Sequence, residues 1–373
     1  MAGELPLAKV GDISRAVRAG HQGFIAPLNY ITRAEALELR ARVFPRGSTV
    51  FAKIGEAIAQ NFRLFTDREV ALDNNTMGAI PRKGIEPRYL FRFLQTVNLY
   101  AYSSKTTVPS VRKSELERIP IPIPPLPEQR RIADILDKAD AIRRKRKEAI
   151  ALTEELLRSA FLEMFGDPVT NPKGWDVKPL GELADIASGV TKGKKYDGRK
   201  LVTVPYMRVA NVQDGHLVLD DVAQITVSEN EASRYLLRRG DVLLTEGGDP
   251  DKLGRGAVWH GEVADCIHQN HIFRVRARED LLPDYLSALV ASQRGKRYFL
   301  RAAKQTTGIA SINMTQLKAF PALVPPRELQ VRYLACAEMT RRARDRQSET
   351  QRELDVLFEN LSRSAFRGEL IAS

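Results

Sequence analysis

The sequence has little cysteine and no long apolar run. Its 373 residues include only Cys266 and Cys336, too few for a disulfide framework and typical of a protein from a reducing compartment. No segment approaches the roughly 20 apolar residues of a membrane-spanning helix. Met1–Gly11 has no apolar core of the kind that a signal peptide needs. We therefore expect a cytoplasmic chain that makes no contact with a membrane.

The sequence also lacks the motifs of enzymes that modify, cut or translocate nucleic acids. An adenine methyltransferase needs an Asn-Pro-Pro-Tyr-type loop for its flipped base and a glycine-rich loop for its cofactor, and neither is present. A Gly-x-x-x-x-Gly-Lys-Ser/Thr loop, which would cradle the phosphates of ATP, is absent as well. We predict no catalytic residue and no bound cofactor in this chain.

The chain carries a surplus of positive charge. Lys and Arg number 58 against 46 Asp and Glu, which gives a formal net charge of +12 spread along the whole sequence. Such a surplus favours an anionic partner, although it does not identify one. The hydrophobic content of 43% indicates globular domains rather than a disordered chain.

Segments of the first half recur in the same order in the second half, which indicates an internal duplication. The offset between matching residues grows from 173 to 205 in one direction, so the matches predict a repeated unit of about half the chain. Short apolar strands, glycine turns and a helix that begins at a proline indicate a mixed α/β domain in each repeat. The matching pairs are Pro6–Ile13 with Pro179–Ile186, Arg46–Phe51 with Arg239–Leu244, Pro87–Leu90 with Pro283–Leu286, Thr106–Pro120 with Thr306–Pro321, and Pro124–Gln129 with Pro325–Gln330.

Each repeat ends in a long segment that follows a double proline and favours helix. After Pro127 neither glycine nor proline occurs through Phe165, so we expect one helix of roughly 55–60 Å at about 1.5 Å per residue. Glu328–Arg367 predicts a second helix. Their narrow apolar stripes follow heptads, which predicts that the two helices pair as a coiled coil between the domains. The residues expected in this seam include Ile132, Ile135, Ile142, Leu156, Leu354, Leu357 and Leu361.

The order of these parts resembles the specificity subunits of type I restriction–modification enzymes, in which two target-recognition domains alternate with two helical regions. The first copy departs from the second by being about twenty residues shorter before Gly47 than the second is before Gly240. The second helix departs from the family pattern by carrying Glu328-Leu329-Gln330 in place of Pro-Glu-Gln. The segments that carry the resemblance are Phe51–Glu56, Leu72–Asn75, Thr106–Val111, Pro124–Ile132 and Gly174–Gly181.

The resemblance implies a mixed α/β fold with two pseudo-symmetric target-recognition domains, residues 1–123 and 167–324, separated by two long antiparallel coiled-coil helices, residues 124–166 and 325–373. It implies a non-catalytic subunit that reads a bipartite target in double-stranded DNA. It also implies two adenine methyltransferase subunits as partners, which bring S-adenosylmethionine, and restriction subunits that use ATP and Mg. The alternative is a helical adaptor whose paired domains bind protein or RNA partners.

Polar, non-helical stretches that recur in both copies are the best candidates for DNA contacts. Lysine and arginine neutralise phosphates, while hydroxyls and amides read base edges. In the first copy the candidates are Lys53, Asn74, Lys105, Thr106, Thr107, Ser110, Arg112 and Lys113. In the second copy they are Lys192, Lys194, Lys195, Arg199, Lys200, Arg208, Asn211, Asn270, Lys304, Gln305, Thr306, Thr307, Ser311 and Asn313.

Each group of candidates also has a purely structural alternative. The threonine pairs and the serines would cap helices that begin near Ser114 and Thr315. The amides would tie down turns, and the basic loop 191–200 would be a solvated loop. The charged run Arg143–Lys147 is typical of a solvated helical stretch, with contact to DNA or a partner subunit as the alternative.

Two further clusters resemble metal sites. Cys266, His268 and His271, with His260 nearby, are zinc-type ligands, but their spacing fits no common zinc module. Glu246 with the following residues 247–252 resembles an acidic site. The first copy has Val70, Leu72 and Asn75 at the positions of the first cluster, which cannot bind a metal, and Ile54-Gly55-Glu56 at the second. We therefore interpret the first cluster as structural and the second as a loop, and predict no metal.

Overall fold

The computed structural model describes residues 4–23, 29–104, 106–196, 198–248, 253–306 and 309–369. The chain divides into two compact units. Unit 1 comprises Met1–Ile150 and Gln347–Ser373, and unit 2 comprises Ala151–Arg346. Each unit combines one α/β region with segments of both long helices, so the units differ from the four segments expected from the sequence, whose bounds stay a prediction.

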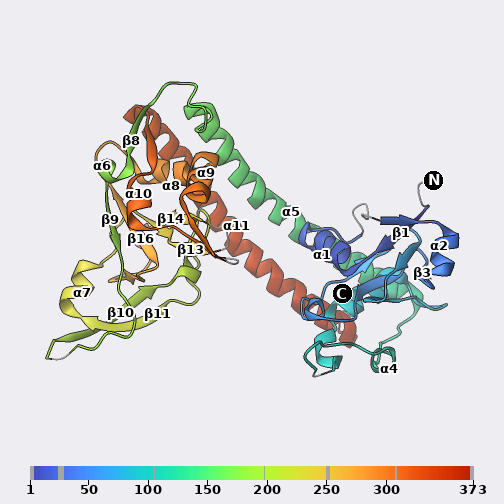
Figure 1. The fold of residues 1–373 in the computed structure, drawn as a ribbon. Coiled ribbons are helices and arrows are strands. Elements are labelled where there is room, and N and C mark those ends of the chain that lie inside the picture. Colours follow the sequence, from blue (N-terminus) through green and yellow to red (C-terminus); the bar gives the residue numbers. More distant parts are fainter. Residues whose placement is uncertain are drawn as a thin grey trace. The chain divides into compact units, whose positions relative to one another are not determined.

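Unit 1 contains two small sheets with short helices around them (Figure 1). The strand orders are β2-β1-β6-β3 and β5-β4-β7. Strand β4 is fully buried, because Val50 and Phe51 belong to two separate hydrophobic clusters. The elements are β1 (Leu5–Ala8), α1 (Val10–Arg18), β2 (Asn29–Ile31), α2 (Arg33–Glu38), β3 (Arg42–Phe44), β4 (Thr49–Ala52), η1 (Glu56–Ile58), β5 (Leu64–Phe65), β6 (Val70–Leu72), β7 (Thr76–Ala79), α3 (Pro87–Thr96), η2 (Leu99–Tyr102) and α4 (Lys113–Leu116).

Unit 2 contains a larger version of the same arrangement (Figure 1). Its main sheet has the order β14-β12-β16-β9, and three smaller sheets have the orders β11-β10-β15, β13-β18-β17 and β19-β8. Strand β12 is fully buried, as β4 is in unit 1. The elements are β8 (Asp176–Pro179), α6 (Leu180–Leu183), β9 (Ala184–Ser188), β10 (Leu201–Met207), η3 (Val209–Asn211), β11 (Ala223–Ser228), α7 (Glu229–Arg234), β12 (Asp241–Thr245), β13 (Gly247–Gly248), β14 (Gly256–Val258), β15 (Ile267–His268), β16 (Ile272–Ala277), α8 (Pro283–Ala291), α9 (Gln293–Ala302), β17 (Lys304–Thr306), β18 (Ile309–Ser311), α10 (Met314–Lys318) and β19 (Pro321–Val324). The predicted mixed α/β fold is confirmed.

One predicted match between the two copies is wrong. Pro6–Ile13 and Pro179–Ile186 have similar sequences but occupy different places in their units. Strand β1 pairs in parallel with β6, as β10 pairs in parallel with β15. Strand β1 therefore corresponds to β10, and the described residues of unit 1 contain no counterpart of β8, α6 and β9.

The local cause of this difference is the length of one helix. In unit 1, α1 continues to Arg18 because Ile13 and Ala16 lie three residues apart and bury the same helical face. In unit 2, α6 ends after one turn and β9 follows directly. Strand β9 pairs with β16, whereas β7 is an edge strand in the part of unit 1 that the structure describes.

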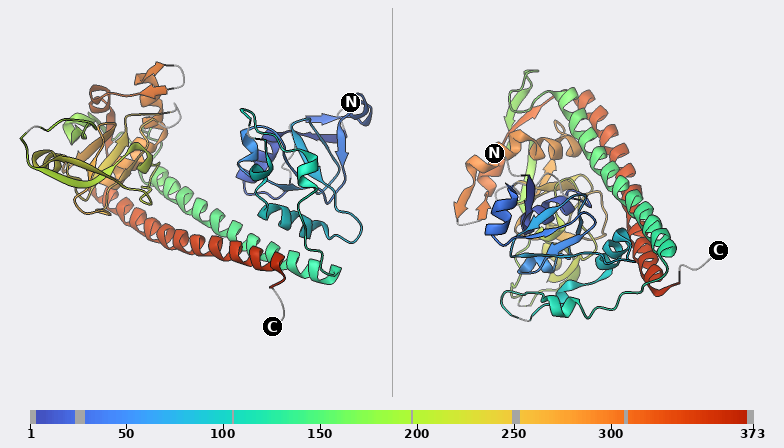
Figure 2. Two further views of the ribbon diagram at one scale, coloured as in Figure 1. Left: turned by 90° about the horizontal axis from the view of Figure 1, so that it is seen from below. Right: turned by 90° about the vertical axis from the view of Figure 1, so that its right-hand side faces the viewer.

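Two long helices, α5 (Leu126–Phe165) and α11 (Arg327–Arg367), confirm the expected helical segments. In unit 1, Arg143 of α5 pairs with Asp355 of α11, and Ala133 shares a cluster with Ala365, so the helical segments run antiparallel. The segments lie side by side in both views of Figure 2. None of the helices in the described residues is long and apolar enough to cross a membrane.

The predicted seam is correct for four of its seven residues and wrong for the other three. Ile132 is buried and Leu361 packs in the same cluster, while Ile135 and Leu354 are half-buried. The predicted seam residues Ile142, Leu156 and Leu357 are 53%, 66% and 59% exposed. Both helices also pack on α3 or α8, through ring contacts of Phe366 with Tyr89 and of Phe161 with Tyr285. This second set of contacts shifts the buried faces away from a strict heptad.

The basic run on α5 is partly structural. Arg143 Nε donates to Asp355 Oδ1 (2.7 Å), and its guanidinium lies 4.4 Å from the ring centre of Phe358. Arg144 pairs with Asp140 on its own helix. The remaining residues of the run, Lys145, Arg146 and Lys147, are exposed, as expected of a solvated stretch.

A buried glutamine attaches each long helix to its α/β region. Gln129 accepts from the Glu86 N–H (2.9 Å) and donates to the carbonyls of Gly84 and Pro124. Gln330 makes the same three bonds, with the Leu282 N–H and the carbonyls of Asp280 and Pro325. The altered residues before Gln330 therefore leave the entry contacts of α11 intact. This joint explains why the Pro-Pro-x-x-x-Gln pattern recurs.

Candidate nucleic-acid interface

Three segments that carry predicted DNA contacts meet in unit 1. They are the residues after β4, the turn between β6 and β7, and the segment 103–112. The Lys53 N–H donates to the Asn75 carbonyl (3.0 Å), and the Val111 N–H donates to the Lys53 carbonyl (2.8 Å). Lys53 thus connects the turn on one side with the segment on the other.

The corresponding three segments meet in unit 2. Glu246, which follows β12, donates its N–H to the His271 carbonyl (3.0 Å), and its own carbonyl accepts from the Ile312 N–H (2.9 Å). Strand β13 then pairs with β18, through Gly247 with Ser311. The same backbone bonds therefore build both clusters. We call the residues at these positions the unit 1 cluster and the unit 2 cluster.

The shared bonds align the two clusters residue by residue. Glu246 corresponds to Lys53 and His271 to Asn75, which makes Asn270 the counterpart of Asn74, as the sequence predicted. The side chains of the first pair carry opposite charges. A carboxylate therefore occupies the unit 2 position where unit 1 has an ammonium group.

Glu246 and His271 form a side-chain pair that the sequence did not reveal. Glu246 Oε2 accepts from His271 Nδ1 (2.6 Å), and Asn270 Nδ2 lies 3.4 Å from His271 Nε2. Glu246 and His271 were assigned to two separate metal-like clusters, because 25 residues separate them. The duplication could have indicated the pair, since the Lys53 N–H donates to the Asn75 carbonyl as the Glu246 N–H donates to the His271 carbonyl.

Most candidates of the first copy lie at the surface of unit 1. Asn74, Thr106, Thr107 and Arg112 are exposed, and Ser110 is half-buried. Lys113 is exposed and forms an ion pair with Glu117. Lys53 is half-buried, and Lys105 lies outside the described residues.

The capping alternative is wrong in unit 1. The residue before α4 is Arg112, whose side chain makes no capping bond. Thr106 Oγ1 instead donates to the Val108 carbonyl (2.8 Å) within its own loop, and the Ser104 and Ser110 hydroxyls lie 3.3 Å apart. These bonds hold the loop in shape.

The second-copy candidates from Lys304 to Ser311 belong to two paired strands rather than an irregular loop. Lys304, Gln305 and Thr306 make up β17, which pairs with β18, the strand that ends at Ser311. Thr307 lies outside the described residues, and for residues 304–306 the structure describes the backbone alone. The hairpin conformation was missed because a short polar strand has no apolar alternation.

Asn313 caps the helix that follows the hairpin. Its Oδ1 accepts from the Gln316 N–H (2.9 Å), and Gln316 Oε1 accepts from the Asn313 N–H (2.8 Å). The cap of this helix is thus an amide, and not one of the threonines or the serine to which the capping alternative assigned it. Asn313 remains exposed, so its predicted base contact stays a prediction, with the cap as a competing role.

The basic loop of unit 2 is partly neutralised by α7. Lys194 forms an ion pair with Glu231 (2.7 Å), and Lys200 with Glu229 (2.5 Å). Lys192, Lys195 and Arg199 are exposed, and no ion pair involves them in the described part of the loop. This loop precedes the long β10–β11 hairpin of unit 2 (Figure 1).

The prediction that Asn211 contacts DNA is wrong. Its side chain is 3% exposed, its Oδ1 accepts from the Arg208 N–H, and its Nδ2 donates to the carbonyls of Val218 and Asp221. The amide thus ties down a turn, which was the structural alternative. Arg208 belongs to the same turn and pairs with Asp221 (2.7 Å).

Cys266 and His268 are core residues. Both are buried, and burial lowers the pKa of His268 to about 4 and raises that of Cys266 to about 12. His268 Nδ1 lies 3.2 Å from the Tyr235 carbonyl. Within the described residues no three potential ligands gather into a metal-holding group.

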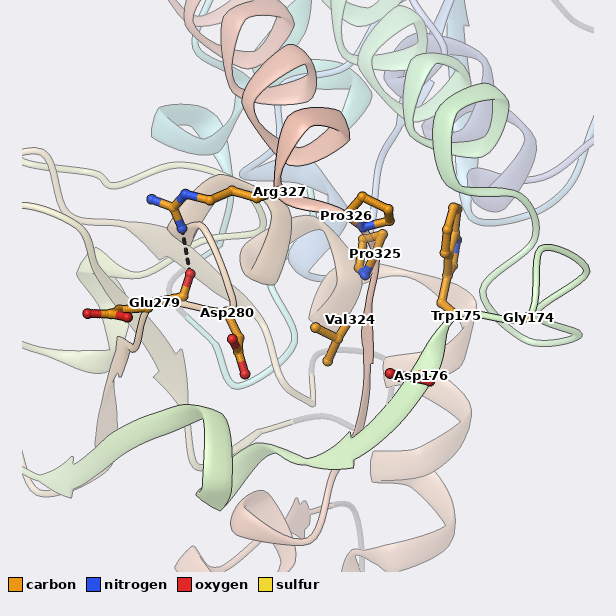
Figure 3. Close-up of a pocket in the computed structure, with 9 residues that line it drawn as sticks. All are labelled: Gly174, Trp175, Asp176, Glu279, Asp280, Val324, Pro325, Pro326 and Arg327. Carbon is orange, nitrogen blue, oxygen red and sulfur yellow. Dashed lines mark hydrogen bonds between the residues drawn. The ribbon is translucent and has the colours of Figure 1, made fainter.

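A cavity of about 450 Å³ lies in unit 2 where β8, the turn before α8 and the start of α11 meet (Figure 3). Trp175, Asp176 and Asp280 line it, together with Arg327, whose guanidinium donates to the Glu279 carbonyl. None of the predicted DNA contacts lines this cavity. It belongs to the joint between the α/β region and α11.

Comparison with known proteins identifies the family. A model described as the type I restriction modification DNA specificity domain matches residues 27–152 and 172–335, which is most of the chain. The chain belongs to the type I restriction–modification specificity subunits. Each matched range covers most of the α/β region of one unit and continues into the long helix that follows it. Membership in a DNA specificity family disfavours the adaptor alternative.

Individual specificity subunits are distant relatives. The chain is 25% identical over 289 residues to the EcoKI specificity subunit of Escherichia coli K12, covering 72% of this chain and 62% of that subunit. It is 27% identical over 278 residues to the MjaIX specificity subunit of Methanocaldococcus jannaschii, covering 65% of this chain and 62% of that subunit. The chain thus spans less than two thirds of either relative.

Two solved structures share the fold of this specificity subunit. One is a chain from a study of complex assembly and conformational transition of the type I R-M system, with a TM-score of 0.55, 22% identity and coverage of 98% of this chain and 92% of that one. The other is the S subunit from M. genitalium, with a TM-score of 0.51, 13% identity and coverage of 98% and 89%. At these identities the likeness concerns the fold alone.

Proposed function

We propose that this specificity subunit reads a bipartite DNA target, with one half-site bound by each unit, and that it catalyses nothing itself. The observation that carries the proposal is the duplication of the cluster. The same backbone bonds hold Lys53 in unit 1 and Glu246 in unit 2 between a turn and a polar segment. Two similar reading surfaces on one chain suit a target made of two separate halves.

Each cluster has the chemistry that a DNA-binding surface needs. Unit 1 exposes Arg112 for phosphates and Asn74 and Thr107 for base edges. Unit 2 exposes Lys192, Lys195 and Arg199 on the loop before β10, where they can neutralise phosphates. The net charge of +12 also favours binding to the negatively charged DNA backbone.

We further propose that the long helices bind two adenine methyltransferase subunits. Large apolar side chains lie exposed along both helices, which is unusual unless a partner covers them. They include Ile142, Leu152, Leu156, Met339, Val356 and Leu357. The methyltransferases would bring S-adenosylmethionine, and restriction subunits that join the complex would bring ATP and Mg. This chain would hold none of these cofactors.

The proposal is tested by expressing the chain with its cognate methyltransferase subunit and mapping methylated adenines across the host genome. We expect methylation at a motif of two short sequences separated by a gap of fixed length. The chain purified alone should transfer no methyl group, cleave no DNA and hydrolyse no ATP. Turnover by the purified chain that is lost on mutating one of its own residues would contradict the non-catalytic role.

A further inference from the structure

We propose that Glu246, held by His271, reads an exocyclic amino group in one half-site, and that Lys53 reads a guanine at the equivalent position of the other. The two side chains would therefore require hydrogen-bonding groups of opposite kind, a donor for Glu246 and an acceptor for Lys53. The inference rests on the proposed function, because it assumes that both clusters face DNA. Neither Glu246 nor His271 was a candidate DNA contact from the sequence.

The geometry fixes the Glu246 carboxylate without occupying all of it. Oε2 accepts from His271 Nδ1 at 2.6 Å, and within the described residues no further hydrogen bond occupies Oε1. The side chains of Glu246 and His271 are 32% and 56% exposed, so both are open to a ligand. Asn270 Nδ2, 3.4 Å from His271 Nε2, restrains the imidazole from its other side.

The loop conformation does not require this side-chain pair. The Glu246 N–H and carbonyl are both bonded to backbone groups, those of His271 and Ile312. Unit 1 builds the same three-segment arrangement with Lys53 and Asn75, and because an asparagine side chain carries no charge, no ion pair of this kind can form there. The pair is therefore an addition to the shared scaffold, which points to a role in ligand binding.

The chemistry of the grooves selects the partner of each side chain. A carboxylate repels phosphates, so at a DNA surface it gains only by accepting from a base, which in the major groove means N4 of cytosine or N6 of adenine. Lysine donates to O6 and N7 of guanine. The charge reversal between Glu246 and Lys53 thus predicts opposite hydrogen-bonding requirements in the two half-sites.

The test compares single variants of the methyltransferase complex. We would map methylated adenines for the wild type, Glu246→Gln, Lys53→Met and the control Lys173→Met, whose residue bonds to backbone carbonyls at the end of α5. Glu246→Gln should weaken the preference at one position of one half-site by roughly 5- to 150-fold. Lys53→Met should do so at one position of the other half-site. The control should leave every position unchanged.

The outcomes separate this inference from the proposed function. A wild-type bipartite motif that stays unchanged in both Glu246→Gln and Lys53→Met would overturn the inference and leave the proposed function intact. A wild type without any bipartite motif would overturn the proposed function, and the inference with it. If Glu246→Gln fails to fold by circular dichroism, His271→Gln replaces it, and an unchanged preference in that variant overturns the inference as well.

Discussion

The joints between α/β region and long helix differ in charge between the two units, although the same glutamine is present in both. In unit 1, the Arg92 side chain is 1% exposed and pairs with Asp137 (2.6 Å) and Asp140 (3.5 Å), both on α5. Arg88 adds bonds to Asp134 and Asp137. The cations therefore lie on α3 and the anions on the long helix.

In unit 2 the charges at the joint are arranged the other way. Asp284 on α8 occupies the position of Arg88, and Ala288 that of Arg92. Burial raises the pKa of Asp284, while Arg341 on α11 lowers it and is the larger of the charge effects. The neutral glutamine bonds position both helices in the same way. The reversed charges then favour the pairing of each α/β region with its own helix.

The largest effect is expected from separating the two units along α5. Four residues inserted after Ala151, at the boundary between units, add nearly one helical turn, about 5.4–6 Å. The apolar faces stay almost in phase, so both half-sites should be unchanged and the gap between them should lengthen by one or two base pairs. Methylated-adenine mapping measures this spacing.

The control for that experiment is an insertion of two residues at the same place. Two residues rotate the following helix by about 200°, which should disrupt the pairing with α11 and abolish methylation. Unchanged spacing in a folded four-residue variant would show that α5 is not the ruler between half-sites. Altered half-sites would show that the units do not read independently.

Removing the buried cation of unit 1 should be the largest single-residue effect on stability. Arg92→Ala removes the nearest cation from Asp137 and one of the three cations that pair with Asp140, and breaking a pair at such a buried guanidinium costs about 3 kcal/mol. Chemical denaturation of the purified chain would measure the loss. Arg118→Ala removes an exposed pair with Glu115 and should cost less than about 0.5 kcal/mol. Equal losses in the two variants would contradict a structural role for the joint.

The two glutamines should contribute about equally, because their bonds are the same. Gln129→Ala and Gln330→Ala each leave a buried backbone N–H and two carbonyls without partners, at a cost of about 2 kcal/mol. Hydrogen exchange at Glu86 and Leu282 would report the loss of each bond locally. A clearly larger cost in one unit would show that the two joints are not equivalent.

The half-buried carboxyl of Asp284 in unit 2 predicts a pH dependence of stability. Because the folded-state pKa of Asp284 is raised, its contribution to stability is fully present below its unfolded pKa and is lost as pH rises through the folded value. At neutral pH, Asp284→Asn should therefore raise the melting temperature, by about 2 °C. Calorimetry of both proteins at pH 7 and pH 4 would show the difference shrinking at the lower pH.

The smallest effects concern single phosphate contacts on the basic loop of unit 2. Lys195→Ala should reduce the salt dependence of DNA binding by about one unit of slope if it neutralises one phosphate. Lys194→Ala should change the slope less, since its ammonium is already paired with Glu231. Fluorescence anisotropy of the complex between 50 and 200 mM salt measures both slopes. Equal slopes in the wild type and Lys195→Ala would show that Lys195 neutralises no phosphate.

The sequence allowed the duplication and the long helices to be predicted, because each depends on local pattern, whereas the glutamine bonds of the joints are visible only in the structure. Double prolines stop structure and glycine-free runs continue helix whatever surrounds them. The helix seam was predicted less well, since Ile142 and Leu156 fit a heptad whose partner face depends on packing against α3 and α8. Strand β1 was misplaced because a short apolar strand fits two positions in the fold.

The candidate site was predicted only in part. Exposed polar residues such as Asn74 and Arg112 lie in the segments expected from the sequence. The burial of Asn211 depends on the carbonyls of a turn that no sequence pattern places. The pairing of Glu246 with His271 joins two segments 25 residues apart, and only the backbone bonds shared with unit 1 bring them together.

The edge strand β7 affects how the isolated chain behaves in solution. Its outer backbone groups are open in the described part of unit 1, and a flat edge of this kind is a template on which strands of other molecules can add. The strand is followed closely by Arg82 and Lys83, whose like charges keep copies apart. Because salt screens that repulsion, concentrated stocks of the chain should aggregate sooner in high salt than in low salt.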